Sequence, residues 1–187
     1  MTGTAGPPQS AEPGVDELGT IATADQMRTL GQRLSGLLHA GDLVVLSGPL
    51  GAGKTTLTQG IGAGLGVRGS VTSPTFVIAR VHPSLSSGPD LVHADAYRLG
   101  SRAEVDDLDL DGDLATAVTV VEWGEGLVED LAPSFLSVSI QADQPAGGED
   151  DAGEADIRRS VRVQGWGERW HGAAAAEGIR LALTGLG

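Results

Sequence analysis

The sequence predicts an α/β fold with a central, mostly parallel β-sheet, antiparallel C-terminal strands and helices on both faces. Short apolar runs at residues 43–46, 91–94 and 117–121 are typical of strands buried on both faces of a parallel sheet. A segment with helical periodicity precedes the first run, and a glycine-rich loop with a second helical segment follows it. This alternation of helix and strand predicts the α/β class.

Residues 23–38 predict the first helix. Thr23 and Gln26 have the spacing of a capping box, in which each residue satisfies a backbone N–H of the other. Apolar side chains then recur at helical intervals until the segment ends before the first apolar run. The recurring positions are Met27, Leu30, Leu34, Leu37 and Leu38.

The only lysine of the chain, Lys54, lies in the sequence GPLGAGKT that begins at Gly48. This is the G-x-x-x-x-G-K-[ST] pattern of a phosphate-binding P-loop, and it lies between an apolar strand and a helix expected over 55–64. We expect Lys54 to reach the β- and γ-phosphates of a nucleoside triphosphate and the Thr55 hydroxyl to bind Mg²⁺. The pattern predicts a P-loop NTPase-like fold, with nucleotide contacts from Gly48, Leu50, Gly51, Ala52, Gly53, Lys54, Thr55 and Thr56.

Two carboxylates follow apolar strands, Asp95 after 91–94 and Glu122 after 117–121. Ligands of α/β proteins bind at the carboxyl ends of the strands, and Mg²⁺ prefers oxygen ligands. We therefore expect both carboxylates beside Thr55 at a metal site. Which of them contacts the metal and which orients water stays open, and either one alone could be a solvated strand end.

Residues 71–81 predict a strand preceded by a loop, and the loop is a candidate switch. Pro74 holds the residue before it in an extended conformation. The Thr75 hydroxyl could then meet the γ-phosphate or Mg²⁺, and such loops become ordered on a triphosphate. A strand-starting turn with a capping threonine is an equally good interpretation.

The second half of the chain predicts further elements around this core. Ser101 and Glu104 have capping-box spacing at the start of a short acidic helix. Two antiparallel strands are expected at 135–140 and 160–163, and a terminal helix at 173–183. The acidic, low-complexity segment 142–156 between those strands predicts a flexible loop. The four histidines have no metal-ligand spacing and are expected to be ordinary residues.

Composition predicts one soluble domain. The chain has 187 residues, which suits a single core over 21–187, while residues 1–20 are rich in small and polar residues and predict a disordered tail. There is no cysteine, so disulfides and thiolate metal sites are excluded. No signal peptide or membrane span is recognisable, and we expect a cytoplasmic protein without a membrane partner.

The net charge of −13 limits the partners. An acidic surface repels phosphate backbones, so we expect no DNA binding and at most indirect contact with RNA. An arginine-bearing protein partner suits such a surface better.

Four motifs, taken in order, resemble the TsaE (YjeE) family, the ATPases of bacterial tRNA threonylcarbamoyladenosine (t6A) synthesis. They are GPLGAGKTT at 48–56, SPTF at 73–76, HADAYRL at 93–99 and VEW at 121–123. The resemblance covers about residues 23–135. Pro49 stands where many members have Asp, and Met27 where many have Thr in the first helix.

The resemblance implies a Mg²⁺-dependent ATPase that acts with the TsaB and TsaD proteins and meets tRNA only through them. It implies weak ATP hydrolysis by the chain alone and stimulation by the partners. Lys54 and Thr55 carry over as phosphate and Mg²⁺ contacts, Glu122 and Asp95 as acidic metal-site residues, and Thr75 as the switch threonine.

Two other functions compete with this one. Small-molecule kinases also use P-loops, but they usually close an arginine-rich lid, and here Arg98 and Arg102 form the only close pair before the C-terminal cluster. A GTP-dependent switch protein would carry an N-K-x-D motif, and this chain has no asparagine. ATP is therefore the expected nucleotide.

Overall fold

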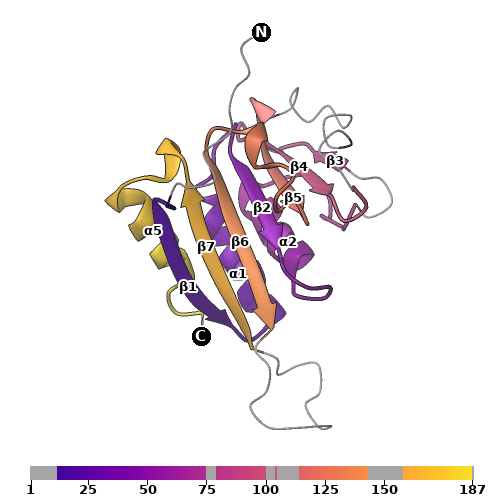
Figure 1. The fold of residues 1–187 in the computed structure, drawn as a ribbon. Coiled ribbons are helices and arrows are strands. Elements are labelled where there is room, and N and C mark those ends of the chain that lie inside the picture. The colour runs from indigo at the N-terminus through magenta and orange to yellow at the C-terminus, as the bar shows by residue number, and fades with distance from the viewer. Residues whose placement is uncertain (1–11, 75–78, 100–103, 105–113, 143–157, 187) are drawn as a thin grey trace, which may run out of the picture.

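The computed structural model describes residues 12–74, 79–99, 104, 114–142 and 158–186. They form one seven-stranded sheet with helices packed against it, as can be followed in Figure 1. The strand order is β1-β7-β6-β2-β5-β4-β3. The four inner strands β6, β2, β5 and β4 are parallel, and antiparallel strands flank them on both sides. The strands are β1 Val15–Ile21, β2 Leu43–Ser47, β3 Ala79–His82, β4 Asp90–Asp95, β5 Ala117–Glu122, β6 Phe135–Ala142 and β7 Arg159–Trp166. The helices are α1 Ala24–Ser35, α2 Lys54–Leu65, α5 Ala173–Leu183 and the short η1 Glu129–Leu131 and η3 Glu168–Trp170.

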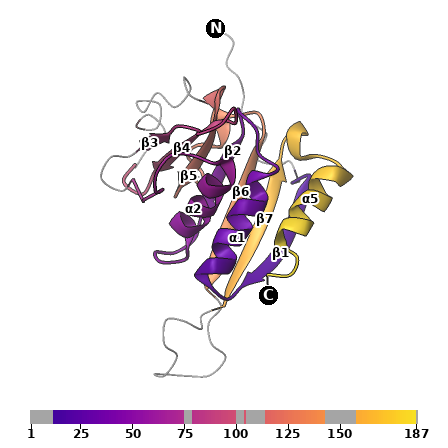
Figure 2. The ribbon, with the colours of Figure 1, turned by 180° about the vertical axis from the view of Figure 1, so that it is seen from behind.

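Both faces of the sheet are covered, but by different material. Helices α1, α2 and α5 lie together on one face (Figure 2), where Val44 and Leu46 of β2 join the larger apolar cluster. Leu43 and Val45, which alternate with them, pack on the other face against Val128 and its neighbours around η1. This alternation, with every residue of the 43–46 run buried, is the reason why β2 reads as a continuous apolar run.

Most predicted elements are present. The capping box of α1 has both hydrogen bonds, since Gln26 N donates to Thr23 Oγ1 at 3.2 Å and Thr23 N donates to Gln26 Oε1 at 3.0 Å. Strands β6 and β7 are antiparallel as predicted, and the terminal helix spans Ala173–Leu183. No helix in the described part of the chain has the length and apolarity to span a membrane.

Two predicted segments are wrong in part. The expected tail at 1–20 contains the start of β1, because Val15–Ile21 pairs with β7 along its whole length; pairing with a distant strand outweighs a polar local composition. Of the strand expected at 71–81, the described residues include Ala79–His82 as strand β3, while residues 71–74 have no ladder partner and 75–78 lie outside the described residues. Pro74 has no N–H to donate to a ladder.

Other predictions fall on residues that the structure does not describe. Thr75 is one of them, as are Ser101 and nearly all of the acidic segment expected to follow it. The acidic loop predicted at 142–156 lies outside the described residues apart from Ala142, which ends β6. The acidic helix and the loop stay predictions.

Candidate functional site

The P-loop connects β2 to α2 at the carboxyl end of the parallel strands. Gly48 has a φ of 134°, and a Cβ there would lie 2.2 Å from the carbonyl oxygen of Ile140, so only glycine fits. Gly53 precedes α2 with a φ of 111° and gives the helix no side-chain cap. The first-turn N–H groups of α2, with the positive end of the helix dipole, are therefore available to an anion.

Lys54 is buried, with only 4% of its surface exposed. Its Nζ donates to the carbonyl oxygens of Gly48 at 2.8 Å and Pro49 at 2.9 Å. The same Nζ lies 3.8 Å from the centroid of a Trp123 ring, which is cation–π distance. Burial lowers the pKa of Lys54, and the nearby carboxylates of Glu122 and Asp95 oppose that shift. The ammonium is thus held by two neutral carbonyl oxygens and an aromatic ring, which are weaker partners for a cation than a charged phosphate oxygen.

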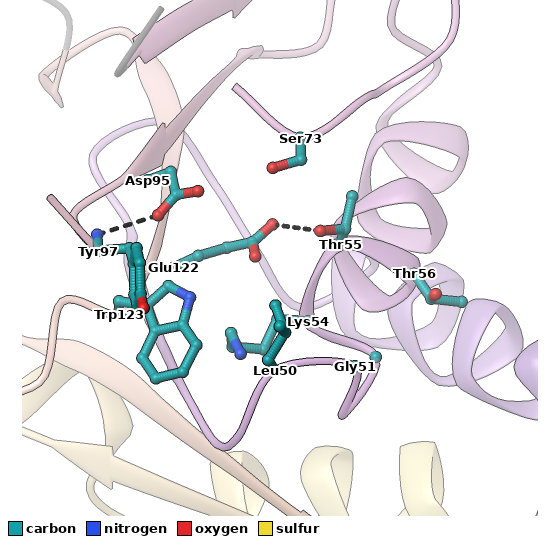
Figure 3. A pocket seen from close by; sticks show the side chains of 11 residues that line it. Leu50, Gly51, Lys54, Thr55, Thr56, Ser73, Asp95, Tyr97, Glu122 and Trp123 are labelled. Carbon is teal, nitrogen blue, oxygen red and sulfur yellow. Dashed lines mark hydrogen bonds between the residues drawn. The ribbon is translucent and has the colours of Figure 1, made fainter. Parts of the chain in front are cut away.

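Glu122 ends β5 and is 3% exposed. Its Oε1 accepts a hydrogen bond from Thr55 Oγ1 at 2.9 Å, which joins the sheet to the first turn of α2 (Figure 3). The same Oε1 lies 2.8 Å from Nε2 of His93. The carboxylate is therefore fixed from two sides.

Asp95 ends the neighbouring strand β4, and its Cα is paired with that of Glu122 in the sheet register. It is buried, and its Oδ1 accepts from the backbone N–H of Tyr97 at 3.0 Å. The two predicted acidic residues thus lie side by side at one edge of the sheet, as the strand ends require.

These side chains line one cavity of about 320 Å³. Its charged members are Lys54, Asp95 and Glu122, one positive and two negative groups with a net charge of −1. A hydroxyl and two carboxylates are the oxygen donors that suit Mg²⁺, which takes its remaining ligands from water and phosphate. Within the described ranges, no three or more His, Cys, Asp or Glu side chains are placed to hold a metal ion together, in this cavity or elsewhere. The lining residues are Leu50, Gly51, Gly53, Lys54, Thr55, Thr56, Ser73, Asp95, Tyr97, Glu122 and Trp123.

The structure brings most of the predicted site residues into this cavity. Two of the predicted P-loop contacts do not line it: Gly48 accepts a hydrogen bond from Lys54 through its carbonyl oxygen, and the side chain of Ala52 is buried. Thr75 lies outside the described residues, although Ser73 just before it lines the cavity.

Sequence reasoning gave no role to three side chains at the site. Trp123 is the only described non-glycine residue with a positive φ, 61°, which marks a strained position typical of functional sites. Its ring lies against that of Tyr97, with centroids 5.1 Å apart. His93 lies two residues before Asp95 on the same strand, and that spacing placed both on one face of the sheet. Period-two spacing was therefore the available signal for His93.

The sheet, the loop and the buried lysine define the chain as a P-loop NTPase-like protein. Comparison with protein families matches residues 21–149 to the family described as "Threonylcarbamoyl adenosine biosynthesis protein TsaE". The chain belongs to the TsaE family.

Individual relatives agree with this assignment. The tRNA threonylcarbamoyladenosine biosynthesis protein TsaE of Streptomyces coelicolor is 63% identical over 145 residues, which cover 77% of this chain and 93% of that protein. The protein of the same name from Mycobacterium tuberculosis is 51% identical over 129 residues, covering 65% of this chain and 77% of its own. A crystal structure of Bacillus subtilis YdiB superposes with a TM-score of 0.63 at 26% identity, covering 88% of this chain and 93% of that one.

Proposed function

We propose that this chain is the Mg²⁺-dependent ATPase subunit of the bacterial t6A modification machinery and acts with TsaB and TsaD in the cytoplasm. One observation carries the proposal: the P-loop lysine, the following threonine and a strand-end glutamate meet in one cavity. Membership of the TsaE family supports the pathway.

Phosphate binding is the first step that these residues support. Lys54 now donates to two neutral carbonyl oxygens, and a triphosphate oxygen is a stronger, charge-assisted acceptor. The first-turn N–H groups of α2 add donors that no side chain occupies. Thr56 lines the same cavity, and we expect its hydroxyl to contact the α-phosphate.

The metal follows from the charge of the cavity. A pocket with a net charge of −1 opposes a free triphosphate, so a bound cation should strengthen nucleotide binding. Thr55, Glu122 and Asp95 would hold Mg²⁺, which when bound neutralises charge on the β- and γ-phosphate oxygens. Because the Thr55 hydroxyl donates its proton to Glu122, its oxygen lone pairs are left for the cation. Asp95 and Glu122 both remain candidates for orienting the attacking water.

Dependence on protein partners is supported by the rim of the cavity. Leu50 and Tyr97 are apolar side chains that stand 91% and 65% exposed at its mouth. A partner that covers them would exclude water and close the site. The net charge of −13 favours contact with tRNA through such partners instead of directly.

Steady-state ATP hydrolysis, measured with and without purified TsaB and TsaD, tests the proposal. We expect weak turnover by the chain alone, a several-fold rise with both partners, and loss of turnover in EDTA. A turnover rate that does not change when TsaB and TsaD are added would refute the partnership. Hydrolysis of GTP at the same rate as ATP would refute the assignment of ATP as the nucleotide. A kinase would instead consume ATP in proportion to an added small-molecule acceptor.

A further inference from the structure

We propose that His93 is a positioning residue for the metal site, because it fixes the carboxylate of Glu122 and through it the hydroxyl of Thr55. The inference rests on the proposed function and adds to it a residue that touches neither nucleotide nor metal.

The contact is short and completely enclosed. His93 is 0% exposed on β4, and its Nε2 lies 2.8 Å from Glu122 Oε1. The neighbouring strand β5 carries Glu122, so two rigid strands set the distance. Oε1 also accepts from Thr55 Oγ1 at 2.9 Å, and the three side chains form one continuous chain of hydrogen bonds.

The surroundings of His93 select its hydrogen-bonding role. Its second ring nitrogen, Nδ1, is buried and has no partner among the described residues. With the hydrogen on Nδ1, a buried donor would go unused and two acceptors would face each other at 2.8 Å. With the hydrogen on Nε2, that donor meets a carboxylate and only a lone pair is left unpartnered. His93 therefore donates to Glu122 through Nε2.

The arrangement leaves Glu122 one defined orientation. The donor from His93 and the donor from Thr55 share one carboxylate oxygen, so rotation of the carboxylate would break both bonds. Without His93, the carboxylate is free to turn and the Thr55 hydroxyl loses its fixed acceptor. Removing such an outer hydrogen-bond partner typically costs 10–100-fold in metal affinity.

His82 provides a matched control inside the same sheet. It is also a buried imidazole, 5% exposed, and its Nε2 has no partner among the described residues. It lies on the edge strand β3 and does not line the cavity. Replacing it removes a buried imidazole of equal size without touching Glu122.

The experiment measures metal and nucleotide affinity separately in the full-length chain. Mn²⁺ binding to the ADP-saturated protein is followed by electron paramagnetic resonance, and binding of a fluorescent ADP analogue is followed in EDTA. For His93→Leu we expect the Kd for Mn²⁺ to rise by about 10–100-fold, with nucleotide affinity in EDTA within about 2-fold of wild type. His93→Gln places an N–H donor near the former Nε2 and should recover most of the Mn²⁺ affinity. His82→Leu should leave the Kd for Mn²⁺ unchanged.

Three results would overturn the inference: an unchanged Kd for Mn²⁺ in folded His93→Leu, an equal loss of nucleotide affinity in EDTA, or no difference between His93→Gln and His93→Leu. Far-ultraviolet circular dichroism establishes that each variant is folded, and His93→Met, which also lacks the N–H donor, replaces His93→Leu if that variant is not folded. A wild-type chain that binds neither Mn²⁺ nor the ADP analogue would refute the proposed function itself. Normal wild-type binding with an unaffected His93→Leu would refute only the role of His93.

Discussion

Charged side chains are placed differently in the parallel centre of the sheet, formed by β6, β2, β5 and β4, and in its antiparallel flank, formed by β1 and β7. At the carboxyl ends of β2, β4 and β5, the groups Lys54, Asp95 and Glu122 are buried around one cavity. On the flank, Asp16 of β1 and Arg162 of β7 form a two-way ion pair in which the side chains are 35% and 53% exposed. The charged side chains of the flank are therefore partly exposed to solvent, whereas those of the centre are buried together.

This difference in burial of charge separates the groups that stabilise the fold from those expected to serve function. Burying a charge costs several kcal/mol that pairing only partly returns, whereas an exposed pair contributes little in either direction. The buried charges are therefore expected to serve binding more than stability, while the apolar residues of the flank hold the sheet together. Substitutions of the buried charged groups in the centre should damage function and leave stability nearly intact, and substitutions of buried apolar residues in the flank should do the reverse.

Replacing Lys54 by methionine should give the largest effect. The change keeps the length of the side chain but removes the ammonium, and we expect turnover with the partner proteins to fall by about 1000-fold. Thermal unfolding should shift by only a few degrees, because removal of the desolvation cost offsets the two lost hydrogen bonds. A collapse of the melting temperature together with turnover would show that Lys54 is part of the scaffold.

The difference in stability between wild type and Lys54→Met should depend on pH, in a direction that the pKa of Lys54 sets. Burial lowers the pKa of Lys54, so the charged form costs stability at pH values below that lowered pKa. The cost disappears as the pH rises through the folded-state pKa toward the unfolded one. Relative to Lys54→Met, the wild-type chain should therefore gain stability over this alkaline range.

Replacing Glu122 by glutamine should follow in size. Turnover should fall by about 100-fold, because the carboxylate that we propose to hold the metal is lost. The net charge of the cavity also changes from −1 to 0, so the fluorescent ADP analogue should bind more tightly than to wild type in EDTA. Weaker binding in EDTA would contradict the charge argument, and Glu125→Gln, outside the cavity lining, is the control for a lost surface charge.

The strands at the centre of the sheet could be predicted from the sequence better than the first strand of the flank, for a physical reason. The strands β2, β4 and β5 are buried on both faces, so their apolar runs and the carboxylates after them were legible. Strand β1 has one exposed face, where Leu18 is 71% exposed, and its residues look like a polar tail until β7 is placed beside them. A strand held by a partner about 145 residues away in sequence leaves little local signal.

Site residues could be predicted from the sequence only where a motif or a position at a strand end indicated their chemistry. The motif predicted Lys54 and Thr55, and position at a strand end predicted Asp95 and Glu122. The contact of His93 with Glu122 depends on the register between β4 and β5, which sequence alone does not supply. The positive φ of Trp123 likewise arises from the turn after β5.

Val163→Ala tests the flank from the opposite direction. Val163 is fully buried in β7, and deleting two methyl groups there should cost about 2 kcal/mol of unfolding free energy in urea denaturation. Binding of the fluorescent ADP analogue should be unchanged under conditions in which the variant is folded. Val81→Ala, the same change at a side chain 47% exposed, should cost almost nothing. A loss of nucleotide affinity in Val163→Ala would show that flank and centre are energetically coupled.

Asp16→Asn should give the smallest effect and sharpens the comparison through its pH dependence. The hydrogen bond from Arg162 holds the pKa of Asp16 below its ordinary value, so the ion pair stabilises the fold above the unfolded-state pKa. That contribution is lost as the pH falls through the lowered folded-state pKa, because protonation then removes the charge in both states. Wild type should therefore be slightly more stable than Asp16→Asn at neutral pH, and the two should converge in acid. High salt at neutral pH should also narrow the gap, since exposed pairs are screened. A gap that survives both acid and salt would mean that Asp16 is held by something other than charge, and the contrast with the buried groups of the centre would fail.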